Sequence, residues 1–416
     1  MKFLHAADLH LDSPMLGLAV YDGAPVDELR GATRRALENL VDLALEEQVA
    51  FVLIAGDVYD GDWKDFNTGL FYVAQMRRLR EAGVPVVAIA GNHDAASRMT
   101  RQLPLPDGYT ALATRKPQTV VLDDLGVAIH GQGFATAAVT ADLSLAYPEP
   151  RPGLLNIGLL HTSAGGRPGH ENYAPCSVDV LVARGYDYWA LGHVHGREVL
   201  HEAPWVVFPG NVQGRHARET GPKGAALVTV DSGRIVDVEH RDLDVVRWAA
   251  CAVDVSGCAT PDEVAIVAAD ALREHVDAAG PRLLAARVTV EGVSDAHAAV
   301  ARDPETVVAA IRARALDLHG DRVWLEKVRL HTRPTVDVAA LRERDDATGE
   351  VLRTVGSVDD DALATLAAGF ADLKAKLPAG VDIDPTDPAF LREALGDVER
   401  LLVAQLESAP AEGTGA

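Results

Sequence analysis

The sequence predicts an α/β fold made of layered sheets and helices, and two observations lead to this prediction. Over residues 1–240, short apolar runs alternate with segments of helical periodicity. Alternation of this kind with short joins is typical of sheets covered by helices. The second observation is that clusters of histidine, aspartate and asparagine follow five of the apolar runs. Ligand sites of open α/β sheets gather at the carboxyl ends of strands, so these clusters agree with the same fold.

The predicted strands are the five apolar runs themselves, which read KFLHAA, AFVLIA, VPVVAIA, LLNIGLL and DYWAL. Residues 27–48 should form a helix, because Leu29, Leu37 and Leu40 belong to an apolar stripe of helical spacing. A second helix is expected over residues 68–82, ending at Gly83. Beyond residue 195 the pattern changes to four runs, REVLHEA, WVVFPG, GAALVTVD and RIVDVEHRDL. Glycine and proline punctuate these runs, which predicts a sheet of hairpins.

A second, smaller α/β block follows. WAACAVDVSG, PRLLAARVTVEG and VWLEKVRLHT are predicted strands, separated by helices over residues 261–280 and 304–318. Amphipathic helices are expected over residues 359–377 and 388–407. The predicted domains are therefore 1–245, 246–333 and a helical region 334–408, with a disordered tail 409–416.

Composition restricts the class of protein. The chain has 416 residues, of which 48% are hydrophobic and 24% charged, as in a globular protein of two or three domains. A net charge of −22 argues against simple electrostatic binding of nucleic acid, although metal ions would neutralise part of it. The three cysteines are too far apart to suggest a disulfide framework or a zinc site. Without a secretory signal or a long apolar run, the protein should be soluble and cytoplasmic.

The polar clusters carry the chemistry. They are Asp8-Leu9-His10, Gly56-Asp57-Val58-Tyr59-Asp60, Gly91-Asn92-His93-Asp94, Leu160-His161-Thr162 and Gly192-His193-Val194-His195. Alternate side chains at the end of an extended strand point the same way, so Asp8 with His10, and His193 with His195, could each face one metal. Imidazoles, carboxylates and an amide suit a pair of Mn²⁺, Fe²⁺ or Zn²⁺ ions. Paired metals of this kind hydrolyse phosphate esters.

Taken together, these clusters resemble the signature of calcineurin-like metallophosphoesterases over about residues 1–240. The segments HAADLHLDSPMLGL, HTSAGGRPGHENYAPCSVDVLVARGYDYWALGHVH and FPGNVQGRHARETGPKG are similar to bacterial DNA repair exonucleases of the SbcD/YhaO group, relatives of the Mre nucleases. The likeness to YhaO is the greater. It implies a four-layer α/β/β/α sandwich, a small α/β capping domain and a C-terminal helical region.

The resemblance also implies the ligands of the two metals. One ion falls to Asp8, His10, Asp57 and His195, and the other to Asp57, Asn92, His161 and His193. Asp57 would bridge them. Mn²⁺ is the preferred metal, with Fe²⁺, Zn²⁺ and Mg²⁺ as alternatives. A metal-bound hydroxide would attack phosphorus.

His93 and Asp60 are the candidate catalytic residues. His93 is not expected to bind metal, and its imidazole can donate a proton to the leaving oxygen. Asp60 could fix the His93 ring, or it could be a turn or helix N-cap residue. Asp94 is interpreted as a helix cap.

Weaker candidates surround these residues. Several basic residues could either contact DNA phosphate or lie in solvated loops. They are Arg215, His216, Arg218, Arg98, Arg101, Arg115 and Lys116. Trp63 and Tyr59 could stack on a base, although core packing is the favoured interpretation. His170 and Glu171 have no assigned role, and His5 and His130 are interpreted as strand histidines.

The predicted function is that of a metal-dependent DNA exonuclease in double-strand break repair. The protein could also act as an endonuclease on single strands. The resemblance implies a homodimer and a coiled-coil ATPase partner of the SbcC/YhaN kind, which the C-terminal helices could contact. Those helices could instead pack on the chain's own domains. The alternatives are a small-molecule phosphatase or nucleotide phosphodiesterase on the same site, and a non-catalytic scaffold for the ATPase.

Overall fold

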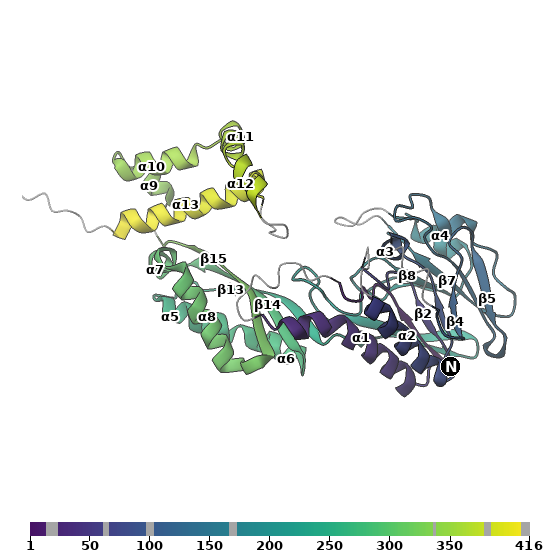
Figure 1. Cartoon of the computed structure of the whole chain (residues 1–416). Helices are drawn as coiled ribbons and strands as arrows, with labels where there is room; N and C mark the ends of the chain where they lie inside the picture. The colour runs from purple at the N-terminus through teal and green to yellow at the C-terminus, as the bar shows by residue number, and fades with distance from the viewer. Residues whose placement is uncertain are drawn as a thin grey trace, which may run out of the picture. The chain divides into compact units, whose positions relative to one another are not determined.

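The computed structural model describes residues 1–13, 24–60, 66–96, 104–165, 173–335, 338–377 and 384–408. The chain divides into two compact units, with Met1–Met15 and Pro25–Trp248 in the first and Ala249–Ala416 in the second (Figure 1). Each unit has its own sheet structure and its own buried core.

The first sheet of the first unit has six strands in the order β12-β11-β1-β2-β3-β4. Its strands are β1 (Lys2–Ala6), β2 (Val52–Ile54), β3 (Val86–Ala88), β4 (Tyr109–Ala111), β11 (Gly224–Asp231) and β12 (Arg234–Asp242). Strands β1 to β4 are parallel, and the β11–β12 hairpin joins β1 in the antiparallel sense. Helices α1 (Val26–Glu46) and α2 (Phe66–Glu81) cover one face, where Leu37 and Met76 share a core with Leu4.

The second sheet also has six strands, in the order β5-β6-β7-β8-β10-β9. It contains β5 (Gln118–Leu122), β6 (Val127–Gln132), β7 (Leu155–His161), β8 (Tyr188–Gly192), β9 (Glu198–Glu202) and β10 (Trp205–Phe208). The inner strands β6, β7, β8 and β10 are parallel, and β5 and β9 are antiparallel edges. Helix α4 (Val178–Ala183) covers the outer face, where Leu181 packs with Trp189.

Alternation along the strands produces the layers. Phe3 joins the core between the two sheets, whereas its neighbour Leu4 joins the core beneath α1 and α2. Tyr188 and Trp189 divide in the same way between the inner core and the core under α4. Successive strand residues point to opposite faces, so each sheet buries both of its faces. The layers run helix, sheet, sheet, helix, which confirms the predicted α/β/β/α sandwich.

The five strands predicted before the polar clusters are present as β1, β2, β3, β7 and β8, and the two predicted helices as α1 and α2. The expectation of one sheet of hairpins after residue 195 is wrong. The β9–β10 hairpin extends the second sheet, whereas β11–β12 extends the first. Strands β4 and β5 were not predicted because they are short and only partly buried, which leaves no strong apolar run.

Gly158 of β7 lies against the indole of Trp189 in the neighbouring strand. A Cβ at Gly158 would stand 2.3 Å from Cε3 of a fully buried Trp189. We expect Gly158→Ala to lower the free energy of unfolding by about 1–3 kcal/mol, the usual effect of overpacking a core. Gly31→Ala is the control, because nothing lies near a Cβ there and alanine favours a helix. Urea unfolding that shows Gly158→Ala to be as stable as the parent would contradict this prediction.

The second unit begins with a small α/β domain. Its three-stranded sheet has the order β13-β14-β15 and consists of β13 (Val246–Asp254), β14 (Leu283–Val293) and β15 (Val323–Arg333). Its helices are α5 (Pro261–Asp270), α6 (Leu272–Ala279), α7 (His297–Arg302) and α8 (Pro304–His319). This arrangement matches the predicted block, with α7 as an addition. The single helix predicted over residues 261–280 is two helices that meet at Ala271.

Among the described residues of the C-terminal region, five helices follow, namely α9 (Val338–Arg342), α10 (Ala347–Gly356), α11 (Asp360–Gly369), α12 (Ala371–Lys376) and α13 (Pro388–Ser408). Leu341, Leu352 and Val403 form a small core among them. The predicted helical region is therefore present, although the helix expected over 359–377 is divided at Phe370. Within the described residues, no helix is both long and apolar enough to cross a membrane.

Candidate metal centre

The five polar clusters converge at one end of the first unit's sandwich. Asp8 and His10 follow β1, Asp57 follows β2, and Asn92 and His93 open the short helix α3 (Asn92–Ala96) after β3. From the second sheet, His161 ends β7, and His193 and His195 follow β8. Parallel strands end at the same edge of a sheet, so the order of the clusters along the chain becomes one site in space.

The backbone at several of these residues is left-handed rather than extended. The φ angle is 52° at Asp8, 42° at His10, 52° at Asp57 and 103° at His193. Alternation along an extended strand is therefore the wrong reason for pairing Asp8 with His10. A non-glycine residue in this region costs about 1–2 kcal/mol, and such residues cluster at functional sites. The loop after β1 and the loop after β2 hold each other in this conformation, since the amide of His10 donates to the carbonyl of Asp57 at 3.0 Å.

The glycines that precede three clusters allow these loops to touch. A Cβ on Gly91 would stand 2.2 Å from Oδ1 of Asp57, and one on Gly192 would stand 2.0 Å from the carbonyl oxygen of Ala55. A Cβ on Gly56 would stand 2.6 Å from Nδ1 of His161. Only glycine permits contacts this close, so the three glycines bring the first and second sheets' clusters together.

Three groups of potential ligands result among the described residues, with ligand atoms in each group within 4.8 Å of one another. Asp8, His10 and His195 form the first group, and Asp57, His161 and His193 form the second. The third group consists of His10, Asp60 and His93 and shares His10 with the first. Asn92 belongs beside the second group, because its Oδ1 lies 2.9 Å from Nε2 of His161. All seven residues named as ligands from the sequence therefore lie at this site.

The donor atoms of the first group fit a shared cation. Nε2 of His10 and Nε2 of His195 lie 3.1 Å apart, so two imidazole nitrogens face one point. Nδ1 of His195 lies 2.7 Å from Oε1 of Glu219, and a carboxylate can only accept, so this nitrogen carries the hydrogen. The lone pair of His195 is then on Nε2, the atom that faces His10, as a metal ligand requires.

The second group also fits a cation, because a ring nitrogen of His161 faces the oxygens of Asn92 and Asp57. Nδ1 of His161 donates to the carbonyl oxygen of Ala55 at 2.8 Å, which leaves Nε2 toward Asn92 and toward Oδ2 of Asp57 at 3.3 Å. Burial lowers the pKa of His161, but the Asp57 carboxylate outweighs burial and raises it to about 9. A buried position that attracts a proton this strongly also suits a divalent ion.

Glu219 was not predicted from the sequence, although it orients His195. Its carboxylate is buried and also accepts from Nδ2 of Asn211 at 3.0 Å and from the amide of Arg215 at 2.7 Å. The only signal in the sequence is an acidic residue a few positions after RH in a loop, which is too common to single out. Carboxylates that hold a ligating histidine set its tautomer and orientation.

We expect Glu219→Ala to weaken Mn²⁺ binding at the site of Asp8, His10 and His195 by about 10–100-fold. The reason is that the His195 ring loses the acceptor that fixes its tautomer. Titration calorimetry measures the effect, with Glu239→Ala as a control because Glu239 is exposed on β12. Equal affinities in Glu219→Ala and the parent would contradict the positioning role.

His93 lies beside the ligand groups and is partly open to solvent, with a side chain 38% exposed. Its Nδ1 lies 3.0 Å from Oδ1 of Asp60, and its ring meets that of His10 edge-on at 5.0 Å. The bond to Asp60 raises the pKa of His93 above its ordinary value. Asp60 thus contacts the His93 ring, as the sequence suggested.

Arg215 is not a solvated loop residue. Its Nη1 lies 3.3 Å from Oδ2 of Asp60 and its Nη2 lies 3.1 Å from Oε1 of Glu219, with the side chain 14% exposed. One guanidinium therefore connects the carboxylate that holds His93 to the carboxylate that holds His195. This geometry shows the solvated-loop interpretation of Arg215 to be wrong, and contact with DNA phosphate stays a prediction.

Asp94 caps the helix α3, as predicted, because it is the third residue of that helix and accepts from the amide of Gly91, which precedes it. Its carboxylate accepts from the amides of Tyr59, at 3.1 Å, Val58, at 3.3 Å, and Gly91, at 3.0 Å. Burial and the neighbouring Asp57 raise its pKa to about 6. Asp94 therefore ties the loop after β2 to the loop after β3, which is how Asp57 and Asn92 are held together.

The remaining candidates have simpler outcomes. Tyr59 is buried and packs against Tyr72, so core packing is the better interpretation. Arg115, Lys116, His216 and Arg218 are exposed. His5 and His130 are buried strand histidines in β1 and β6, and Cys176, Cys251 and Cys258 are free and buried. Trp63, Arg98, Arg101, His170 and Glu171 lie outside the described residues.

Known proteins are similar to this chain over both units. Residues 1–197 match the calcineurin-like phosphoesterase family, and residues 248–333 match the middle domain of metallophosphoesterase YhaO. The uncharacterized metallophosphoesterase YhaO of Bacillus subtilis is 36% identical over 260 residues, which cover 62% of this chain and 64% of that protein.

More distant relatives are described as DNA double-strand break repair proteins Mre11. The one from Methanopyrus kandleri is 26% identical over 62% of this chain and 60% of its own length. The one from Sulfurisphaera tokodaii is 25% identical over 59% of this chain and 63% of its own length. The chain thus spans less than two thirds of the length of these relatives. A solved dimetal phosphatase from Danio rerio covers 58% of this chain and 96% of its own, with 12% identity and a TM-score of 0.37.

The two matches fall on the parts that the structure separates. The calcineurin-like match ends just after His195, the last of the clustered residues, and the YhaO match coincides with the α/β domain of the second unit. Residues 1–197 therefore belong to a calcineurin-like phosphoesterase domain, and residues 248–333 belong to a YhaO-type middle domain.

Proposed function

We propose that the protein is a phosphodiesterase that cleaves DNA at a centre of two divalent metal ions. The observation that carries the proposal is the pair of adjacent ligand groups with His93 beside them. One ion would be held by Asp8, His10, Asp57 and His195. The other would be held by Asp57, Asn92, His161 and His193, with Asp57 common to both.

The protein's own groups can then be given roles. Bound metals would neutralise a phosphodiester and make a water nucleophilic at neutral pH. His93 would donate a proton to the leaving oxygen, because it is accessible and does not belong to either ligand set. Asp60 would hold the ring of His93, and Arg215 would fix Asp60 and Glu219 against each other.

DNA is proposed as the substrate for two reasons. The similar Mre11 proteins are described as acting in DNA double-strand break repair. The second unit adds a domain and helices that hydrolysis of a small ester does not need. We propose Mn²⁺ as the metal, exonuclease action as the main activity, and single-strand endonuclease action as a further one. A homodimer and a coiled-coil ATPase partner of the SbcC/YhaN kind belong to the same proposal.

A direct comparison of substrates tests this function. Purified protein with Mn²⁺ is incubated with end-labelled linear DNA, with p-nitrophenyl phosphate and with a nucleoside monophosphate, beside His93→Ala. We expect release of nucleotides from DNA, lost in His93→Ala, with slow turnover of the two monoesters. Rapid hydrolysis of either monoester with the DNA left intact would instead favour the small-molecule phosphatase. No hydrolysis of any substrate would favour a non-catalytic scaffold.

A further inference from the structure

A cavity of about 570 Å³ lies in the first unit next to the candidate metal centre. Two of its walls are the segments that carry the predicted ligands. Val58 and Tyr59 directly follow Asp57, and Asp94 and Ala95 directly follow His93. A third wall includes Phe134, whose ring meets that of His161 edge-on at 5.4 Å. The side chain of Phe134 therefore lies between the cavity and the predicted ligand His161.

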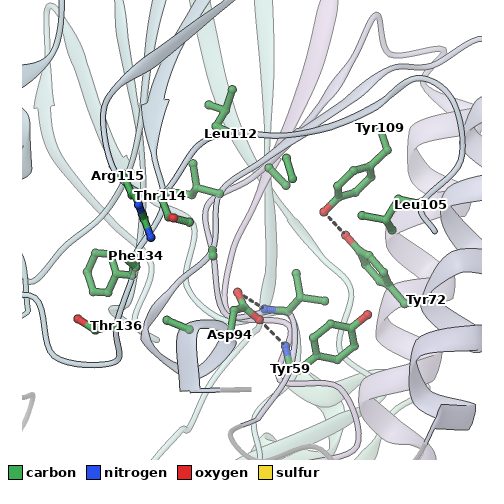
Figure 2. A pocket seen from close by; sticks show the side chains of 17 residues that line it. Tyr59, Tyr72, Asp94, Leu105, Tyr109, Leu112, Thr114, Arg115, Phe134 and Thr136 are labelled. Carbon is green, nitrogen blue, oxygen red and sulfur yellow. Dashed lines mark hydrogen bonds between the residues drawn. The ribbon is translucent and has the colours of Figure 1, made fainter. Parts of the chain in front are cut away.

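The lining combines aromatic side chains with polar groups, and among the rings Tyr59, Tyr72 and Phe134 are almost fully buried while Tyr109 is partly exposed. Figure 2 shows Tyr59, Tyr72 and Tyr109 on one side, with Thr114 and Arg115 across from them. The hydroxyls of Tyr72 and Tyr109 lie 3.0 Å apart, and burial raises the pKa of both, so neither ring carries charge at neutral pH. Asp94, at the bottom of the view, already accepts from the loop amides.

This combination selects a class of ligand. Pockets of about 300–1,000 Å³ with apolar walls and a few polar groups are typical sites for compact organic groups. Aromatic faces stack on planar rings, while threonine hydroxyls and a guanidinium can bond to ring nitrogens and carbonyl oxygens. A nucleobase has this chemistry, and in a DNA substrate it is tethered to the phosphate at the neighbouring metal centre.

We propose that this cavity binds the unpaired base of the nucleotide next to the bond that is cut. The proposal rests on the proposed function, since DNA must supply both the base and the phosphate. Stacking in such a site is worth about 1–3 kcal/mol per base, so removal of the base should weaken binding about 5–150-fold. The cavity would thereby position the end of a strand for cleavage.

The test uses oligonucleotides with 2-aminopurine, a fluorescent base that is quenched on stacking. In EDTA, without cleavage, we expect the protein to quench 2-aminopurine at one strand end but not in the middle of a strand. Ala111→Trp and Thr136→Trp, which fill the cavity from exposed positions, should abolish the quenching. Ala137→Trp, exposed and not part of the lining, is the matched control.

A second arm measures hydrolysis in Mn²⁺. An abasic nucleotide at the responsive end should raise KM by at least about fivefold in the parent. Ala111→Trp should raise KM for normal DNA by a similar factor. In this variant, KM should be the same for DNA with a normal end and for DNA with an abasic end. Turnover of methyl p-nitrophenyl phosphate, which has no base, should be unchanged in both cavity variants.

The outcomes separate the two proposals. Cleavage of DNA without quenching, or with equal KM for normal and abasic ends, overturns the base site and leaves the proposed function intact. Absence of DNA cleavage with active turnover of methyl p-nitrophenyl phosphate overturns the proposed function. Quenching of free 2-aminopurine deoxyriboside, with none for DNA, overturns the base site for DNA and indicates a nucleoside instead.

Discussion

Replacement of His93 by alanine is expected to lower kcat for DNA cleavage by about 10²–10⁴-fold, the usual contribution of a general acid. Both metal ions should still bind, because His93 is not one of the seven proposed ligands, although it lies close enough to His10 and Asp60 for metal content to be measured. The expected loss is in turnover rather than in binding of DNA. Steady-state kinetics together with metal analysis of the dialysed protein separate these quantities.

Two further variants show whether His93 works through its orientation. Asp60→Asn keeps the shape beside Nδ1 of His93 but removes the charge, so kcat should fall. Because Oδ1 of Asp60 also lies 3.5 Å from Nδ1 of His10, a proposed ligand, the metal content of this variant is measured together with its kcat. Asp124→Asn is the control, because it removes the same charge at an exposed position outside the site. A His93→Ala protein that has lost its metals would contradict the assignment of His93 as the acid, because it would then be a ligand.

Replacement of Asp57 by alanine is expected to remove both metal ions and to reduce DNA cleavage to background. Asp57 is 1% exposed, and its Oδ2 lies 3.3 Å from Nε2 of His161. Burial alone would raise its pKa, but His161 holds the pKa below its ordinary value, so the carboxylate is charged. Its other oxygen accepts from the amide of His93 at 2.9 Å, which ties the second cluster to the third.

Thermal unfolding measures the loss of metal independently of activity. A ligand present at 100 times its Kd stabilises the folded state by about 2.7 kcal/mol. The parent should therefore show a higher Tm in Mn²⁺ than in EDTA, and Asp57→Ala should show no difference. Asp124→Ala, at an exposed position, is the control. An Asp57→Ala protein that retains one equivalent of metal would contradict the shared ligand.

The location of the site could be predicted because it follows from a few strong signals. Each cluster comes directly after an apolar run, and parallel strands bring their carboxyl ends to one edge, as β1, β2 and β3 do. The buried ends of β7 and β8 do the same in the second sheet. These signals are local in the chain, so they can be recognised in the sequence without knowledge of the order of strands in the sheets.

The details that could not be predicted depend on contacts between distant residues. Glu219 acts on His195 from a different loop, and Arg215 reaches Asp60 across 155 positions of sequence. Asp94 caps α3, as predicted, but its further bonds to the amides of Val58 and Tyr59 join it to a different loop, which the sequence does not show. The left-handed backbone at Asp8 and His10 is imposed by pairing with the loop of Gly56 and Asp57.

The most direct test of the account compares leaving groups in His93→Ala. A DNA phosphodiester leaves as an alkoxide that needs a proton, whereas methyl p-nitrophenyl phosphate releases a stable phenolate that does not. If His93 protonates the leaving oxygen at an intact metal centre, the loss in kcat/KM should be at least about 100-fold larger for DNA than for the aryl ester. Equal losses for the two substrates would contradict it, because His93 would then support the metals or the fold rather than the departing oxygen.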